Sequence, residues 1–260
     1  MSDFPFLQAL VLEGVYSAYW VVWPMPIDNV RSMLPPGLKL GQQDITSEST
    51  HPVLLAFGQH RHARLTEFQF LFDNVTYLES SISIPFVEFE VEEQQKNYEK
   101  NFLYVARLYL NNFRAIVGGD LFWGFTKELG KINPGNQFFQ TYQVNSYIFD
   151  QPITSLDFEV TGNYGKPSDF SNFSVVQKIM NQPLILKTIQ GFGPYVYANY
   201  IWNFDEAIIR PIKAEVNIFQ AYVPGLNPGS KYSVEGIDRV ELGAFQMINP
   251  WVLQLPSLVV

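Results

Sequence analysis

Short apolar segments rich in Tyr, Phe, Val and Ile recur along the chain and are separated by Gly, Pro and Asn. This spacing is typical of β-strands bounded by turns. The pattern therefore predicts a mainly β protein. The predicted strands are residues 16–23, 52–60, 102–110, 141–149, 156–162, 184–191, 194–204 and 212–223.

Two of these segments differ in how their faces are patterned. Both alternating faces of residues 102–110 are largely apolar, which predicts a strand that is covered on both sides. Residues 212–218 instead alternate between apolar and polar positions, which predicts a half-buried strand. The apolar face carries Ile212, Ala214, Val216 and Ile218, and the polar face carries Lys213, Glu215 and Asn217.

Three segments are predicted to be helices. The first follows Pro26 and is stopped by Pro35, Pro36 and Gly37; the second runs from about residue 119 to 129 and ends at Gly130. The third covers residues 171–181, with Ser168 and Asp169 as candidate caps before it. Many strands and few helices favour a barrel or a pair of packed sheets over βαβ units.

Composition narrows the class of protein. The 260 residues contain no internal repeat or linker, so we expect one domain over residues 1–260. A hydrophobic content of 47% can form a large core, and a net charge of −8 argues against nucleic-acid binding. Cysteine is absent, which excludes disulfides and cysteine nucleophiles. With no basic signal-peptide region and no membrane-spanning apolar run, we expect a cytoplasmic protein that does not bind membranes.

The segment GQHRH places His60 and His62 two residues apart. A metal site needs at least a third ligand, and His51 is the only other histidine. A solvated loop is the simplest interpretation, and a metal site or a pocket-lining His60 are the alternatives. Residues 119–126 have the glycine spacing of a phosphate-binding loop, but Phe125 stands where that loop needs its Lys, and no Gly-x-Ser-x-Gly motif occurs.

A candidate acid lies in the segment YLESSISIPF. Glu79, Ser81 and Ser83 share one face of the expected strand, and the apolar parity changes after Pro85, which predicts a bulge or break there. A carboxylate on such a face is usually solvated. If the face lined an enclosed barrel, burial would raise the pKa of Glu79 and let it transfer protons.

A candidate nucleophile lies in GGDLFWGFTKELG. In the expected helix, Lys127 points away from an apolar stripe, and Trp123 lies one turn before it. One interpretation is an exposed lysine whose stem packs on the indole. The other is a lysine facing a dry cavity, where desolvation lowers its pKa and leaves the amine neutral for imine formation. The apolar stripe consists of Leu121, Phe122, Phe125 and Leu129.

Residues 111–130 resemble the signature of the acetoacetate decarboxylase family, D-N-x-P-A-I-x-x-G-R-E-x-x-x-F/Y-P-K-K-L-G, without a gap. Residues 77–86 resemble the Glu-Ser strand of that family, and residues 25–38 its first helix with the proline stop. Residues 214–225 are compatible with its late strands. The resemblance implies a closed β-barrel flanked by additional antiparallel sheet and a few short helices, in a protein that forms a homo-oligomer.

By position, the resemblance implies that Lys127 forms the Schiff base, that Glu79 is an active-site acid or base, and that Phe125 lines the pocket. The substrate is then a small keto acid, and neither a metal nor an organic cofactor is needed, because the imine itself accepts the electrons. Trp123 is expected to share the cavity with Lys127. Gln59 is the closest polar substitute for a second acidic residue of the family, which aligns near Leu55.

The chain departs from the family pattern at several positions. Glu128 replaces the second lysine, Arg114 and Asp120 replace a proline and an arginine, and Pro24 stands where another arginine is expected. Three functions are therefore considered. The first is decarboxylation of an acetoacetate-like β-keto acid through an imine and enamine on Lys127. The second is Schiff-base aldol condensation and dehydration of 2-oxo acids, and the third is non-catalytic binding of an apolar ligand.

Overall fold

In the computed structural model, nine strands close into a mixed barrel. The structure describes residues 11–66, 73–96, 98, 100–123, 127–135, 140–187, 194–219, 222–227 and 229–259. Neighbouring strands in this ring are antiparallel except β5 and β6, which are parallel. In order around the ring, the strands are β5 (Phe102–Leu110), β6 (Glu128–Asn133), β7 (Thr141–Ser146), β8 (Pro152–Val160), β12 (Ile208–Ile218), β14 (Ala244–Gln254), β1 (Val11–Pro26), β3 (Thr50–Leu65) and β4 (Val75–Phe89), which pairs with β5 again.

Further strands lie outside the ring. Beside β5 run β9 (Leu184–Lys187), β10 (Tyr195–Ala198) and β15 (Ser257–Leu258), and β11 (Tyr200–Trp202) pairs with β14. The short strands β2 (Leu38–Leu40) and β13 (Ser230–Val234) pair with β4 and β12. The helices are α1 (Ile27–Arg31), α2 (Glu92–Gln95), α3 (Phe113–Trp123) and α4 (Phe173–Met180), with a 3₁₀ turn at Pro167–Asp169.

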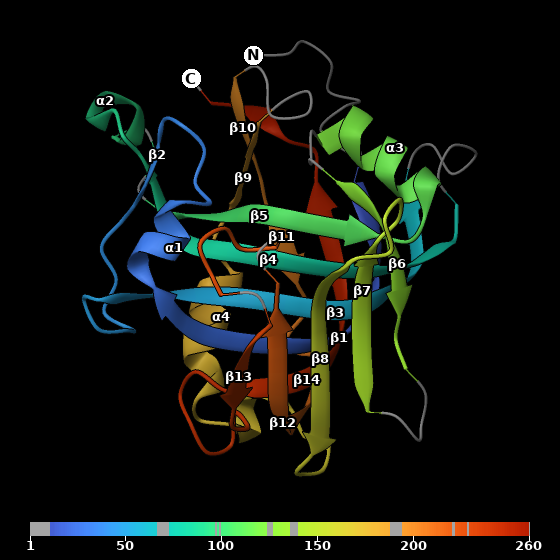
Figure 1. Ribbon diagram of the computed structural model, residues 1–260. Coiled ribbons are helices and arrows are strands. Elements are labelled where there is room, and N and C mark those ends of the chain that lie inside the picture. The colour runs from blue at the N-terminus through green and yellow to red at the C-terminus, as the bar shows by residue number, and fades with distance from the viewer. Residues whose placement is uncertain are drawn as a thin grey trace.

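The strands β14 and β5 each change their pairing partner along their length, so the sheet surrounds two separate spaces, the barrel and a second enclosure. The first half of β14 pairs with β12 and its second half with β11, whereas β5 pairs with β9 near its start and with β6 at its end. Five strands, β14, β1, β3, β4 and β5, are therefore shared. One face of this shared sheet belongs to the barrel, and the other is covered by β9, β10, β11, α3 and α4. In Figure 1 the shared strands β1, β3, β4 and β5 run across the centre, and β7, β8 and β12 cross them steeply.

Alternation along the shared strands produces two separate cores. In β1, Ala18 and Trp20 pack in the core outside the barrel, whereas Val21 and Trp23 pack in the core inside it. Because successive side chains of a strand point to opposite faces, one apolar strand supplies both cores. The same holds for β5, so the prediction that residues 102–110 are covered on both sides is confirmed.

Most predicted strands are confirmed, with shorter or longer bounds. Residues 141–149 form a strand only to Ser146, and residues 194–204 divide into β10 and β11. The bulge expected at Pro85 is present: Phe86 has a left-handed φ of 56°, and the pairing of β4 with β5 shifts between Ile84 and Val87. Residues 188–191 and 220–221 of two predicted strands lie outside the described residues.

The helix predictions require corrections. Residues 27–31 and 173–180 are helical as expected, but Ser168 and Asp169 lie in the 3₁₀ turn and do not cap α4. The helix predicted over residues 119–129 is present only to Trp123 and starts earlier than expected, because α3 covers Phe113–Trp123 and Glu128–Asn133 forms β6. The start of α3 has a local cause. Asn112 accepts hydrogen bonds from the backbone N–H groups of Arg114 and Ala115 through its side chain, which is the role of an N-cap residue.

Helix α3 connects the parallel strands β5 and β6. Parallel neighbours need a crossover connection, and α3 provides it. The chain therefore leaves the shared sheet at the end of β5, crosses over the second enclosure, and returns at β6. Among the described residues no helix is long and apolar enough to span a membrane.

We predict that Tyr142→Phe lowers the free energy of unfolding by about 0.5–1.5 kcal/mol, because a typical intramolecular hydrogen bond contributes about that much. The Tyr142 hydroxyl on β7 donates toward the carbonyl oxygens of Gly58 and Glu79, at 2.9 and 3.0 Å, and so links β7 to β3 and β4. Urea unfolding measures the change. The control is Tyr222→Phe, since that hydroxyl makes only a 3.5 Å contact with Ser80 and should matter less. Equal stability of Tyr142→Phe and the wild type would contradict this assignment.

Candidate functional site

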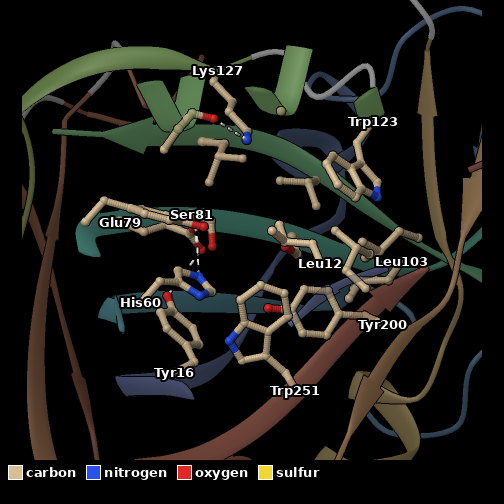
Figure 2. A pocket seen from close by; sticks show the side chains of 18 of the residues that line it. Leu12, Tyr16, His60, Glu79, Ser81, Leu103, Trp123, Lys127, Tyr200 and Trp251 are labelled. Carbon is tan, nitrogen blue, oxygen red and sulfur yellow. Dashed lines mark hydrogen bonds and ion pairs between the residues drawn. The ribbon is translucent and has the colours of Figure 1, made fainter. Parts of the chain in front are cut away.

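A cavity lies in the second enclosure, on the face of the shared sheet that points away from the barrel. Its walls come from β1, β3, β4, β5, β9, β11 and β14, with α3, Lys127 and Met180 of α4 completing it. Figure 2 shows that the walls differ in character: Glu79, Ser81, His60 and Tyr16 gather on one side, while Leu12, Leu103 and Tyr200 lie on the other. The cavity is thus polar at one end and apolar at the other.

Lys127 lies in the connection between α3 and β6, and its side chain reaches back toward the helix. Its Nζ donates to the carbonyl oxygen of Ala115, at 3.1 Å. The amine also lies against Gly119, because a Cβ at that position would overlap Nζ and Cε of Lys127. The absence of a side chain at Gly119 therefore creates the space in which the amine sits.

The surroundings make this amine less basic than an ordinary lysine. Burial lowers the pKa of Lys127 to about 8, although the negative charges of Glu79 and Asp120 act in the opposite direction. At pH 7 a pKa of about 8 leaves about a tenth of the molecules with a neutral amine, some 300 times more than a pKa of 10.5. The interpretation of Lys127 as an exposed lysine is therefore wrong. The expectation of a pKa lowered by desolvation is met by the structure.

Glu79 lies opposite Lys127 on β4, and each of its carboxylate oxygens has a partner. Tyr16 donates from its hydroxyl to Oε1 at 3.2 Å, and His60 Nε2 lies 3.3 Å from Oε2. Burial pushes the pKa of Glu79 up, but His60, Lys127 and Tyr16 outweigh it, so the pKa is lowered. The raised pKa considered from the sequence is therefore wrong, since the structure supplies partners that the strand pattern does not show.

His60 is buried in β3, with 4% of its side chain exposed, so its placement in a solvated loop is wrong. Its ring stacks on Tyr16 at 3.9 Å between centroids and on Tyr77 at 4.7 Å, and the edge of Trp251 meets it at 5.0 Å. The alternation of side chains along the strand indicates from the sequence which face His60 lies on. Residues 52–60 form a strand, and Leu54, Ala56 and His60 share one face of it.

His62 does not join His60 on that face. The pairing of β3 with β4 shifts between His60 and Ala63, and His62 has a left-handed φ of 54°. Its exposed ring bonds to Asn74, whereas His51 is buried against the carbonyl oxygen of Pro85. Within the described part of the chain, no three histidine, aspartate or glutamate side chains could hold a metal ion.

The other predicted site residues fall in different places. Trp123 lines the cavity, and its indole N–H donates to the carbonyl oxygen of Gln254, at 2.9 Å. Gln59, predicted to bind substrate, does not line the cavity: it precedes His60, points to the opposite face of β3, and accepts from Arg61. Phe125 lies outside the described residues.

Two departures from the family signature differ in their effect. Asp120 raises the pKa of Lys127, and its own pKa is raised by burial, against the opposing charge of Lys127. Its Oδ1 is buried without a hydrogen-bond partner among the described residues. Glu128 is exposed at the start of β6 and raises the pKa of Tyr109, which burial also raises. Glu128 does not appear among the charges that shift the pKa of Lys127.

Positive charge in the cavity is restricted to two residues. Every lysine, arginine and histidine of the sequence falls within the described ranges, and only Lys127 and His60 line the cavity. Pro24, which stands where the family has an arginine, is exposed on β1. The structure thus brings together Lys127, Glu79, Trp123 and His60, whose place in a pocket was one of the alternatives from the sequence, in a cavity without an arginine.

Sequence comparison agrees with this arrangement. The profile of the family described as acetoacetate decarboxylase (ADC) matches residues 8–191. The chain belongs to the acetoacetate decarboxylase family. A search of curated protein sequences gives no match.

Solved structures of this family share the fold. An acetoacetate decarboxylase from Legionella pneumophila subsp. pneumophila strain Philadelphia 1 superposes with a TM-score of 0.61 and 14% identity, over 100% of this chain and 92% of that chain. The enduracididine biosynthesis enzyme MppR, solved with the condensation product of pyruvate and imidazole 4-carboxaldehyde, gives 0.61 and 13%, over 96% and 89%. An acetoacetate decarboxylase-like enzyme from Sphingomonas wittichii RW1 gives 0.58 and 13%, over 96% and 93%. At such identities the similarity shows a common fold, and the family match supports an enzyme.

We predict that Gly119→Ala displaces the Lys127 amine and reduces trapping of a ketone on it at least tenfold, with little change in the midpoint of thermal unfolding. The added methyl group meets only the flexible end of a lysine, and alanine is the better helix former by about 1 kcal/mol. Borohydride trapping followed by peptide mass analysis measures the effect. Gly130→Ala is the matched control, since its added Cβ would meet ordinary contacts of 3.5 Å and longer. Unchanged trapping in Gly119→Ala would show that the amine does not need this space.

Proposed function

We propose that this protein is a Schiff-base lyase that decarboxylates a small, acetoacetate-like β-keto acid through an imine and an enamine on Lys127. The observation that supports this most directly is the amine itself, whose pKa is lowered to about 8 by burial in a largely apolar cavity facing Glu79. A neutral amine is the nucleophile that imine formation requires. The cavity volume of about 100 Å³ favours a small substrate, because an apolar cavity of about 150 Å³ takes up benzene.

The reaction follows from the chemistry of the amine. The nitrogen of Lys127 attacks the ketone carbon of the β-keto acid, and loss of water gives a protonated imine. The bond between the α-carbon and the carboxylate then breaks, its electrons move toward the imine nitrogen, and carbon dioxide leaves. The neutral enamine that remains takes up a proton on carbon. Hydrolysis of the resulting imine releases the ketone and regenerates the amine.

The apolar walls favour the step in which carbon dioxide leaves. Before that step the bound intermediate carries a positive imine and a negative carboxylate, and after it both charges are gone. Surroundings of low polarity favour a reaction in which opposite charges disappear, because water no longer stabilises the separated charges. No arginine lines the cavity to hold the carboxylate in place. The arginine missing from the family pattern is therefore compatible with decarboxylation.

A second function is Schiff-base condensation and dehydration of 2-oxo acids. It is favoured by the similarity in fold to MppR, whose structure contains the condensation product of pyruvate and an aldehyde. A 2-oxo acid keeps its carboxylate through such a reaction, so that carboxylate needs a lasting binding group. His60 is the one cationic candidate besides Lys127, and it already faces Glu79. For this reason we rank decarboxylation first. Homo-oligomeric assembly and a cytoplasmic location stay predictions from the sequence.

We predict that incubation with acetoacetate and borohydride adds a reduced adduct to the peptide containing Lys127, and that carbon dioxide is released when borohydride is omitted. Lys127→Gln should abolish both, because among the described residues, which include every lysine, no other amine lines the cavity. Lys131→Gln is the control, since Lys131 follows on β6 but is exposed and pairs with Asp150. Mass spectrometry of peptides and a carbon dioxide assay give the two readings.

The outcomes separate the candidate functions. An adduct with pyruvate and condensation with an aldehyde, without carbon dioxide release from acetoacetate, would favour the aldolase-dehydratase. No adduct with any small keto acid, in a folded protein, would contradict both enzymatic functions and favour a non-catalytic barrel that binds an apolar ligand.

A further inference from the structure

We propose that His60 is the proton reservoir of the site: its ring holds the proton that Glu79 passes to the enamine carbon. This inference rests on the proposed Schiff-base function and adds a residue that the family signature does not contain. His60 acts through Glu79, so its role is to supply and position the proton.

The stoichiometry of the reaction creates the need for such a group. A β-keto acid anion plus one proton gives a ketone plus carbon dioxide, so each turnover takes up one proton, and that proton ends on carbon inside the cavity. Lys127 cannot deliver it, since its nitrogen is bound to the substrate at that stage. The proton must come from another lining residue.

Among the lining residues, the other titratable groups are poor candidates. Glu79 holds no proton at rest near neutral pH, because its pKa is lowered by His60, Lys127 and Tyr16 despite its burial. The phenols of Tyr16, Tyr77 and Tyr200 hold theirs too tightly, since burial and the charge of Glu79 raise the pKa of each well above 10. His60 is the remaining lining group with a ring nitrogen in contact with Glu79, and imidazole is a common proton shuttle in proteins.

The geometry connects His60 to the carboxylate that faces the substrate. Nε2 of His60 lies 3.3 Å from Oε2 of Glu79, while Tyr16 occupies Oε1 from the other side. At this distance a proton can pass directly from the ring nitrogen to the carboxylate oxygen. When Glu79 gives a proton to the enamine carbon, the proton on Nε2 moves to Oε2, and the ring becomes neutral until solvent reprotonates it.

The ring is also fixed in this orientation. Tyr16 and Tyr77 stack on its two faces, with interplanar angles of 11° and 25°, and Trp251 closes its edge. Nδ1 is buried without a hydrogen-bond partner among the described residues. The cationic ring carries a hydrogen on each nitrogen, and the one on Nε2 faces an acceptor, Oε2 of Glu79, so that proton is the transferable one. The aromatic rings around His60 thus hold its Nε2 facing Glu79.

Hydrogen exchange of a ketone tests this role apart from the carbon dioxide step. In D₂O, a ketone that forms an imine on Lys127 and tautomerises to the enamine exchanges its α-hydrogens, which NMR detects. With 2-butanone as the probe, we expect His60→Gln to lower the exchange rate at least tenfold while borohydride trapping of 2-butanone on Lys127 stays within about twofold. Glutamine keeps a hydrogen-bond donor beside Glu79, but its amide cannot donate a proton to the carboxylate.

Matched variants and the pH profile separate proton supply from packing. Tyr16→Phe removes the other partner of Glu79 and should lower exchange less than His60→Gln, because a phenol of such high pKa does not release its proton. His62→Gln, at an exposed histidine two residues on, should have no effect. The pH profile of the exchange rate should change in His60→Gln and keep its wild-type shape in His62→Gln.

The contrary results are distinct. Exchange in His60→Gln within twofold of the wild type, with trapping intact, would overturn the role of His60 and leave the Schiff base standing. Trapping absent from the wild type would contradict the proposed function itself. If His60→Gln does not fold, ¹⁵N NMR of the three histidines in the wild type decides: a His60 ring whose protonation stays constant from about pH 5 to 9 would overturn the proposal.

Discussion

The desolvated amine of Lys127 is the constraint on which the rest of the site depends. A charged ammonium group is costly to hold away from water, so burial shifts the equilibrium toward the neutral amine. The two nearby carboxylates, Glu79 and Asp120, limit this shift and keep the pKa at about 8. The amine is therefore neutral in enough molecules to attack a carbonyl carbon. In the remaining molecules it is charged and stabilises the carboxylate of Glu79. The acidic partner is constrained in turn, because Glu79 stays ionised only through His60, Tyr16 and Lys127.

The fold creates this constraint through one unusual connection. Among the described strands of the barrel ring, β5 and β6 form the parallel pair, and the crossover helix α3 lies over the second enclosure. Lys127 sits where this crossover returns to the sheet, so its side chain points back under the helix toward Ala115 and Gly119. The opposite wall belongs to the shared sheet, where the polar face of β4 presents Glu79, Ser81 and Ser83. The same sheet is anchored from the barrel side by Tyr142, so the rigid core supports the wall that carries the acid.

Local patterns were sufficient to predict most strands and one face of the site. The face shared by Glu79, Ser81 and Ser83 follows from alternation and lines the cavity. The role of Lys127 required the family resemblance, because its local pattern also fits an exposed lysine. The helix bounds differ from the prediction because Asn112 caps the helix at an earlier residue, and because pairing with β5 and β7 makes residues 128–133 a strand. His60 and the lowered pKa of Glu79 depend on contacts among β1, β3 and β4, which a single segment does not contain.

The central claim is that Lys127 works as a nucleophile because the cavity lowers its basicity, and the pKa of that one amine tests it most directly. The rate at which an amine-specific reagent modifies Lys127 can be followed against pH by mass analysis of its peptide, with the exposed Lys131 in the same sample as an internal reference. The account predicts a midpoint of about 8 for Lys127. A midpoint near the ordinary lysine value of about 10.4 would contradict it.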